Sequence, residues 1–179
     1  ALKGFAETFK TLGIKFDKEY YESDLYLLGK KEVEEGLKKG LFKRDDTGAV
    51  IAELERFGLP NKVLLRKDGT TVYMTFDIAF AKIKLKDFKA QDSIYVVGNE
   101  QNLHFAQLFK ILELQGFAAD RCYHLSYGMV MLPSGRMKSR EGQTADADDI
   151  YDELSELSRK ELKRRHKLPP KERERRAKI

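Results

Sequence analysis

The sequence contains almost no cysteine: Cys122 is the single one among 179 residues, and there is no tryptophan. One cysteine cannot form a disulfide within the chain, and no Cys/His cluster has the spacing of a zinc site. No apolar run approaches the roughly 20 residues of a membrane-spanning helix, and no signal peptide opens the chain. These absences predict a cytoplasmic protein with no metal centre and no membrane partner.

Several catalytic signatures are also missing. Gly98 is a lone glycine at its turn, and no G-x-x-x-x-G-K-[ST] motif exists to cradle a phosphate. No Ser/His/Asp triad and no activated cysteine can be assembled from the sequence, which has only three histidines. The sequence therefore argues against P-loop nucleotide hydrolysis and against covalent catalysis by a serine or cysteine.

Positive charge is concentrated at one end of the chain. Residues 159–179 hold 11 Lys or Arg against 3 Asp or Glu, a net of +8, so residues 1–158 carry −3 of the total +5. Such a tail attracts a nucleic-acid backbone. More often, however, a run in which acids alternate with bases, such as KERERRAK, is a solvated helix, and both interpretations stay open.

Hydrophobic spacing predicts one α/β domain with a short tail. A parallel strand buried on both faces is expected at 94–97, with the following helix at 100–115. Asp68-Gly69 predicts a hairpin turn, and Thr75 is expected to cap a helix with the inner face Ile78, Ala81 and Leu85. The remaining expected elements are helices at 2–12, at 24–39 and from Thr144 or Asp146 to Pro169, and strands at 14–16, 63–65, 71–73 and 122–127.

Polar side chains follow three of these strands, at the point where each strand ends and the next element begins. Ligands of α/β sheets bind at such ends. The side chains are Tyr73 and Asp77, then Gln101 and His104, then Arg136, Lys138 and Arg140. A carboxylate, an amide and an imidazole followed by a basic loop suggest a site for a cation and a polyphosphate. Each residue also has a structural interpretation: Asp77 as an acid in the first turn of its helix, and His104 as a packed histidine.

Three ordered blocks resemble one enzyme family. They are VLLRKDGTTVYMTFDIAFA, IYVVGNEQNLHFAQLFKILELQGF, and HLSYGMVMLPSGRMKSREG followed by TADADDIYDEL. Residues 62–154 are similar to the later half of the catalytic domain of arginyl-tRNA synthetases, which are class I aminoacyl-tRNA synthetases. The resemblance implies a partial Rossmann-like parallel sheet with flanking helices, an Asp-Gly hairpin and a C-terminal helix.

The resemblance also implies roles for particular residues. Tyr73 and Asp77 would receive the arginine guanidinium, and Gln101 the α-amino group; Glu100 and His104 would border the nucleotide. The remaining implied residues are Met129 and Val130 beside adenine, and Arg136, Lys138, Ser139 and Arg140 in a KMSKS-like loop that neutralises the ATP phosphates. ATP, accompanied by Mg²⁺, would activate L-arginine to arginyl-adenylate for transfer to tRNA-Arg. The loop is not a literal KMSKS, and Phe76 stands where the family often has arginine.

No HIGH-like motif occurs in the sequence. The expectation is therefore a fragment of an arginine–tRNA ligase, inactive alone: residues 1–158 as the later half of the catalytic domain, and 159–179 as a basic helical tail towards an anticodon-binding domain. Exposed surface on the incomplete sheet would favour a homodimer of the fragment. Two alternatives remain: a free-standing paralogue that binds arginine or nucleotide without ligation, and a tRNA-binding accessory module.

Overall fold

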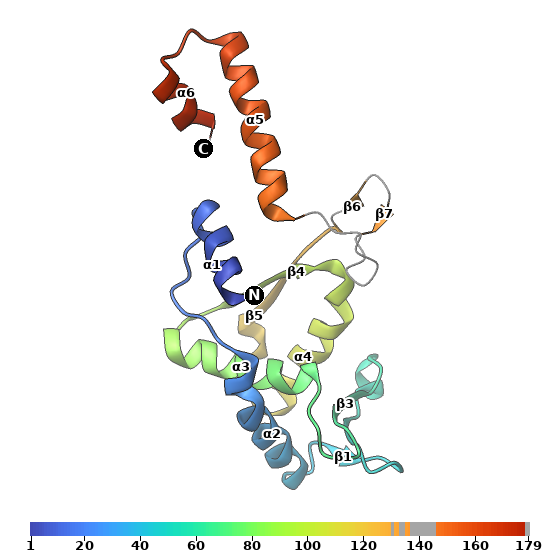
Figure 1. The fold of residues 1–179 in the computed structure, drawn as a ribbon. Helices are drawn as coiled ribbons and strands as arrows, with labels where there is room; N and C mark the ends of the chain where they lie inside the picture. Colours follow the sequence, from blue (N-terminus) through green and yellow to red (C-terminus); the bar gives the residue numbers. More distant parts are fainter. Residues whose placement is uncertain (130, 133–134, 137–145, 178–179) are drawn as a thin grey trace. The chain divides into compact units, whose positions relative to one another are not determined.

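The computed structural model describes residues 1–129, 131–132, 135–136 and 146–177 (Figure 1). The chain divides into two compact units, one comprising Lys18–Met129 and the other combining Ala1–Asp17 with Val130–Ile179. The division of the sequence at residues 158 and 159 into domain and tail stays a prediction.

The larger unit is a mixed α/β fold with two small sheets. β4 (Ser93–Gly98) and β5 (Cys122–Tyr127) run parallel and are connected through α4 (Asn102–Leu114). The second sheet is antiparallel, in the order β1-β2-β3: β1 (Lys43–Arg44), β2 (Val50–Ala52) and β3 (Lys62–Leu65). The predicted α/β class, with a parallel sheet and flanking helices, is confirmed.

Two helices pack closely beside the antiparallel sheet, α2 (Glu22–Lys38) and α3 (Tyr73–Phe88). At Gly29 the helices approach so closely that an added Cβ would lie 2.4 Å from the carbonyl oxygen of Thr75. Ile78, Ala81 and Leu85 of α3 are buried, as their spacing predicts. The largest fully buried side chains in the unit are Leu54, Leu64, Met74, Ile78, Leu108, Ile111 and Leu112.

The Asp68-Gly69 turn forms, but the second arm of the predicted hairpin does not. Asp68 Oδ1 accepts the backbone N–H of Thr70 at 2.9 Å, and Gly69 takes a φ of +77°. Thr71 then makes a single bridge to Leu65 before the chain enters α3 at Tyr73. The strand predicted at 71–73 is therefore wrong.

The reason lies at Thr75. Its hydroxyl accepts the backbone N–H of Val72 at 3.1 Å and donates to the carbonyl of Leu64 in β3. Thr75 therefore caps α3 as predicted, but it does so as the third residue of the helix, while Val72 occupies the N-cap position. The buried hydroxyl instead attaches the start of α3 to β3.

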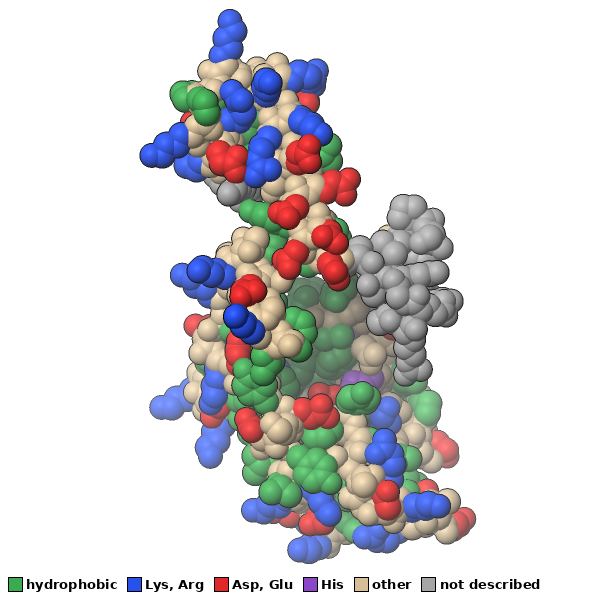
Figure 2. Space-filling view, in the orientation of Figure 1, with side chains coloured by type: hydrophobic (Ala, Val, Ile, Leu, Met, Phe, Trp, Pro, Cys, Tyr) green, Lys and Arg blue, Asp and Glu red, His purple; other side chains and the backbone are tan. Residues whose placement is uncertain are grey.

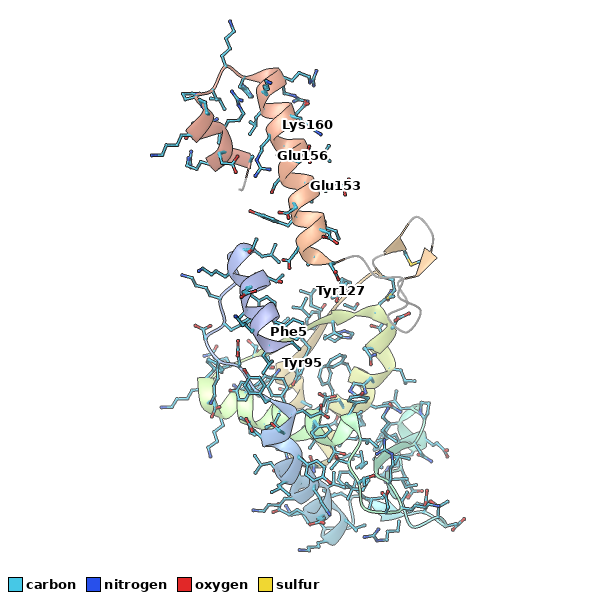
Figure 3. The ribbon with its side chains drawn as sticks, viewed as in Figure 1. Phe5, Tyr95, Tyr127, Glu153, Glu156 and Lys160 are labelled. Carbon is cyan, nitrogen blue, oxygen red and sulfur yellow. The ribbon has the colours of Figure 1, made fainter. Side chains whose placement is uncertain are left out.

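The parallel pair has one covered face and one open face. Tyr95 of β4 is buried against Phe105 and Phe109 of α4, whereas Ile94 and Val96 are 61% and 64% exposed. In the register of the sheet, these exposed residues stand opposite Tyr123 and Leu125 of β5, which are also exposed. The prediction that β4 is buried on both faces is therefore wrong. Figure 3 labels Tyr95 of β4 and Tyr127, the last residue of β5.

The smaller unit contains α1 (Leu2–Thr11), the paired strands β6 (Met131–Leu132) and β7 (Gly135–Arg136), and the helices α5 (Ala147–Arg165) and α6 (Pro170–Ala177). No strand forms at 14–16, where Ile14 and Phe16 are exposed. The helix predicted to run to Pro169 ends at Arg165. Pro170 then opens α6, because proline needs no hydrogen-bonded N–H at the first helical position.

Most of the basic side chains in α5 and α6 are paired with acids. The Arg159 guanidinium donates two bonds of 2.8 Å to Glu174, which joins the two helices. Glu161 accepts from Arg164 and Arg165 one turn away. Figure 2 shows acids gathered at the start of α5 and bases towards α6, and Figure 3 labels Glu153, Glu156 and Lys160 along α5. These pairs support the solvated-helix interpretation, while nucleic-acid contact stays a prediction.

Candidate functional site

Tyr73 and Asp77 lie on one face of α3 because they are four residues apart on a helix. Tyr73 is the first residue of α3 and Asp77 the fifth, so the prediction that Asp77 belongs to the first turn is wrong. The field of a helix terminus falls off within that turn. The start of α3 therefore does little to stabilise the Asp77 charge.

The second group of polar residues follows the carboxyl end of β4. After Gly98 the chain makes one 3-10 turn, η2 (Asn99–Gln101), and then enters α4. Gln101, His104 and Gln107 recur every third residue and line one cavity. Gln107 is buried and donates to the carbonyl oxygen of Pro60 at 2.8 Å, so this residue holds α4 to the loop before β3.

A hydrogen bond between side chains joins the two helices. His104 Nε2 lies 2.6 Å from Asp77 Oδ2, and the two side chains are 16% and 34% exposed. Within the described part of the chain, His104 is the one hydrogen-bond partner of the Asp77 carboxylate. The imidazole is therefore the side chain that fixes the position of the Asp77 carboxylate.

Asp77 and Tyr73 open onto a cavity of about 220 Å³, which we name the acid–aromatic cavity. It is lined by Tyr20, Glu22, Leu25, Tyr73, Phe76, Asp77 and Phe80. Two carboxylates and four aromatic rings meet there, and none of the lining residues that the structure describes is Lys or Arg. A planar cation suits this combination, since carboxylates accept its N–H groups and ring faces attract its charge.

Tyr73 also lines a second cavity of about 620 Å³, which we name the amide–imidazole cavity. Its polar lining is mixed: Asn61, Lys62, Glu100, Gln101, His104 and Gln107. Tyr73, which lines both cavities, is 79% exposed. The site therefore has two compartments of different character with one shared residue.

Lys84 lies two turns beyond Asp77 in α3. Its ammonium group is 3.6 Å from the centre of the Tyr95 ring, and burial lowers the pKa of Lys84. Burial likewise raises the pKa of Tyr95, whose hydroxyl has no hydrogen-bond partner among the described residues. The same ammonium group is 4.6 Å from the centre of the Phe80 ring, so this cation faces two aromatic rings.

Five of the residues predicted for the site come together around the two cavities: Tyr73, Asp77, Glu100, Gln101 and His104. Met129, after β5, lines neither cavity. The backbone of Arg136 belongs to β7 in the other unit. Val130, Lys138, Ser139 and Arg140 lie outside the described residues.

The sequence interpretation missed Glu22, Tyr20 and Phe80, which complete the acid–aromatic cavity. The available signal was an acid directly after two tyrosines at a helix start, in the run Tyr20-Tyr21-Glu22. Spacing alone could not place this run beside Asp77, because the contact depends on the packing of α2 against α3.

Comparison with known proteins decides the family. Residues 6–178 match the family described as tRNA synthetases class I (R), catalytic domain. The chain belongs to this family. It is 54% identical over 159 residues to an arginine–tRNA ligase of Flavobacterium psychrophilum, covering 88% of this chain and 26% of that protein. It is 50% identical over 180 residues to an arginine–tRNA ligase of Parabacteroides distasonis, covering 98% of this chain and 30% of that protein.

Solved structures agree on the fold. The arginyl-tRNA synthetase of Thermus thermophilus matches with a TM-score of 0.79 at 22% identity, over 99% of this chain and 36% of that one. The Plasmodium falciparum arginyl-tRNA synthetase matches with a TM-score of 0.76 at 19% identity, over 99% of this chain and 30% of that one. This class I synthetase chain thus spans 26% to 30% of the length of the two curated relatives.

Proposed function

We propose that this chain supplies the arginine-binding part of the active site of an arginine–tRNA ligase. The observation that carries the proposal is the acid–aromatic cavity, where Glu22 and Asp77 face aromatic rings and the described lining residues include no Lys or Arg. Arginine has the side chain that this arrangement fits best, because a guanidinium is planar, cationic and rich in N–H donors.

Each polar residue has a distinct role in the proposal. Asp77 accepts two parallel N–H bonds from the guanidinium, and the Tyr73 hydroxyl accepts a further N–H. Glu22 adds a second negative charge at the mouth. Gln101 lies in the neighbouring cavity, and its side-chain oxygen accepts a bond from the α-amino group of the substrate.

The proposed reaction begins when an oxygen of the arginine carboxylate attacks the α-phosphorus of ATP. A new O–P bond forms, the bond to the β-phosphate breaks, and pyrophosphate leaves with arginyl-adenylate as product. The arginyl group is then transferred to tRNA-Arg, with Mg²⁺ accompanying the phosphates. The residues that we assign to the ATP-binding site are Glu100, His104, Met129 and Val130. Negative charge develops on the phosphates during the reaction, and the residues that we assign to neutralise it are Arg136, Lys138, Ser139 and Arg140.

A segment exchange tests the proposal. The matching region of the Flavobacterium psychrophilum ligase is replaced by this chain, and arginine-dependent ATP–pyrophosphate exchange and tRNA charging are measured. We expect both activities, and we expect Asp77→Asn to raise the KM for arginine while the KM for ATP changes little. Arginine kinetics that Asp77→Asn leaves unchanged would contradict the proposal.

We also propose that the chain is cytoplasmic and self-associates through the open face of β4 and β5. Ile94, Val96, Tyr123 and Leu125 form a continuous exposed apolar surface there, and such surfaces favour association. None of the helices in the described ranges is long and apolar enough to cross a membrane. Light scattering of the chain at several concentrations tests self-association, with Val96→Lys as the comparison.

A further inference from the structure

We propose that His104 is a positioning residue for arginine: it holds the Asp77 carboxylate in the orientation that receives the guanidinium. This inference rests on the proposed arginine site and changes the role of His104 from a residue beside ATP to a residue that acts through Asp77. The observation behind it is the 2.6 Å separation of His104 Nε2 and Asp77 Oδ2.

The carboxylate needs such a partner because of where it stands. Asp77 is the fifth residue of α3, beyond the free N–H groups of the first turn, and within the described part of the chain only His104 is bonded to it. A carboxylate without a fixed partner rotates about its terminal torsion, which has a broad preference. Bidentate binding of a guanidinium requires one particular orientation of that group.

The bond to His104 leaves Asp77 able to bind substrate. An ionised carboxylate offers about four lone-pair positions, and the imidazole N–H occupies one of them on Oδ2. Asp77 lines the acid–aromatic cavity while His104 lines the other one, so the imidazole approaches from outside the guanidinium compartment. His104 therefore fixes the carboxylate without filling the space proposed for the ligand.

His104 is itself held in place. It belongs to α4, whose inner residues Phe105, Leu108 and Ile111 are buried, and its ring stands edge-on to Phe105 with 5.6 Å between the ring centres. Only the Nε2 edge meets Asp77. The proposal therefore requires a ring whose Nε2 carries a proton, in either the neutral or the charged form.

The test uses the 179-residue chain and NMR titration with arginine and with citrulline, whose side chain ends in a neutral ureido group. Three variants are compared with the wild type: His104→Ala, His104→Gln and Asp77→Asn. Gln is the conservative replacement because its amide N–H₂ reaches about as far as Nε2. Two-dimensional ¹H–¹⁵N spectra establish that each variant is folded, and ¹⁵N shifts of the imidazole report which nitrogen is protonated.

We expect His104→Ala to weaken arginine binding by roughly tenfold, with a much smaller effect on citrulline, and His104→Gln to restore most of the preference. When Asp77→Asn is already present, we expect His104→Ala to cause almost no further loss of arginine binding. The imidazole ¹⁵N shifts should show a proton on Nε2.

Two results would overturn the inference. If Asp77→Asn removes the preference for arginine but His104→Ala and His104→Gln both bind like the wild type, the arginine site stands and the positioning role is wrong. If Nε2 is found unprotonated in the folded chain, the role is also wrong, whatever the stability of the alanine variant. Equal binding of arginine and citrulline by the wild type would instead contradict the proposed function itself.

Discussion

The two cavities that share Tyr73 differ in charge and in size. The acid–aromatic cavity holds about 220 Å³ between two carboxylates and four rings, whereas the amide–imidazole cavity holds about 620 Å³ and mixes Lys62, Glu100, amides and His104. A small cavity of one charge sign selects a cation, and a large mixed cavity accommodates a zwitterionic or polyanionic group. Arginine has both kinds of group, at opposite ends of the molecule.

The two cavities are also built from different elements of the chain. The acid–aromatic cavity is formed between α2 and the start of α3, while the other is formed by α3, β3 and the start of α4. The bond between His104 and Asp77 crosses from one compartment to the other. The two cavities can therefore be perturbed separately, except at α3.

The largest expected effect is on the acid–aromatic cavity. Asp77→Asn should weaken arginine binding by about 2–5 kcal/mol, because a charge-assisted pair to a desolvated cation is lost. Arginine titration of the variant measures this, and the exposed Asp92→Asn is the matched control. An equal loss in both variants would mean that general charge, and not the cavity, attracts arginine.

Gly29→Ala should perturb both cavities together. Its Cβ would lie 2.4 Å from the carbonyl oxygen of Thr75, the residue that fixes the start of α3 and hence Tyr73. We expect the free energy of unfolding to fall by about 1–3 kcal/mol, measured by urea denaturation. Gly4→Ala serves as control, since a Cβ at that helical position meets nothing within 4 Å. Similar stability of the two variants would show that α2 can shift away from α3.

Gln101→Ala should affect the amide–imidazole cavity alone. Losing one hydrogen bond to the α-amino group should weaken arginine binding by about 0.5–1.5 kcal/mol. Citrulline binding should weaken by the same factor, because the two ligands have the same α-amino group. A selective loss of arginine would place Gln101 beside the guanidinium and would reverse the assignment of the two cavities.

The smallest effect is expected at Glu22. This side chain is exposed, so the solvent screens its charge, and Glu22→Gln should weaken arginine binding by only about 0.2–1 kcal/mol. Asp24→Asn is the control, because Asp24 also belongs to the first turn of α2 but lines neither cavity. The ratio of the two effects separates the contribution of the cavity from that of the helix terminus.

The sequence predicted most of the helices and the parallel strands because their signals are local. The apolar run at 94–97 and the buried face of Ile78, Ala81 and Leu85 follow from spacing within one element. The start of α3 could not be predicted in this way. It depends on a hydrogen bond from Thr75 to Leu64, a contact between residues 11 positions apart.

The site was predicted through the resemblance to the synthetases and only weakly through single residues. Read alone, Asp77 and His104 each had an ordinary structural explanation. The bond between them, and the approach of Glu22, arise from helices that pack together across separations of 27 and 55 positions in the sequence. Such pairings appear only once the helices are placed in three dimensions.

Intermolecular nuclear Overhauser effects between ¹³C-labelled arginine and the 179-residue chain would show which cavity receives each end of the ligand. We expect contacts from the arginine δ-methylene group to the rings of Tyr73, Phe76 and Phe80, which line the acid–aromatic cavity. We expect contacts from the α-proton to residues that line the amide–imidazole cavity. Contacts from the δ-methylene group to Val63 and Leu103, which line only the amide–imidazole cavity, would show that the guanidinium does not bind beside Asp77 and Glu22.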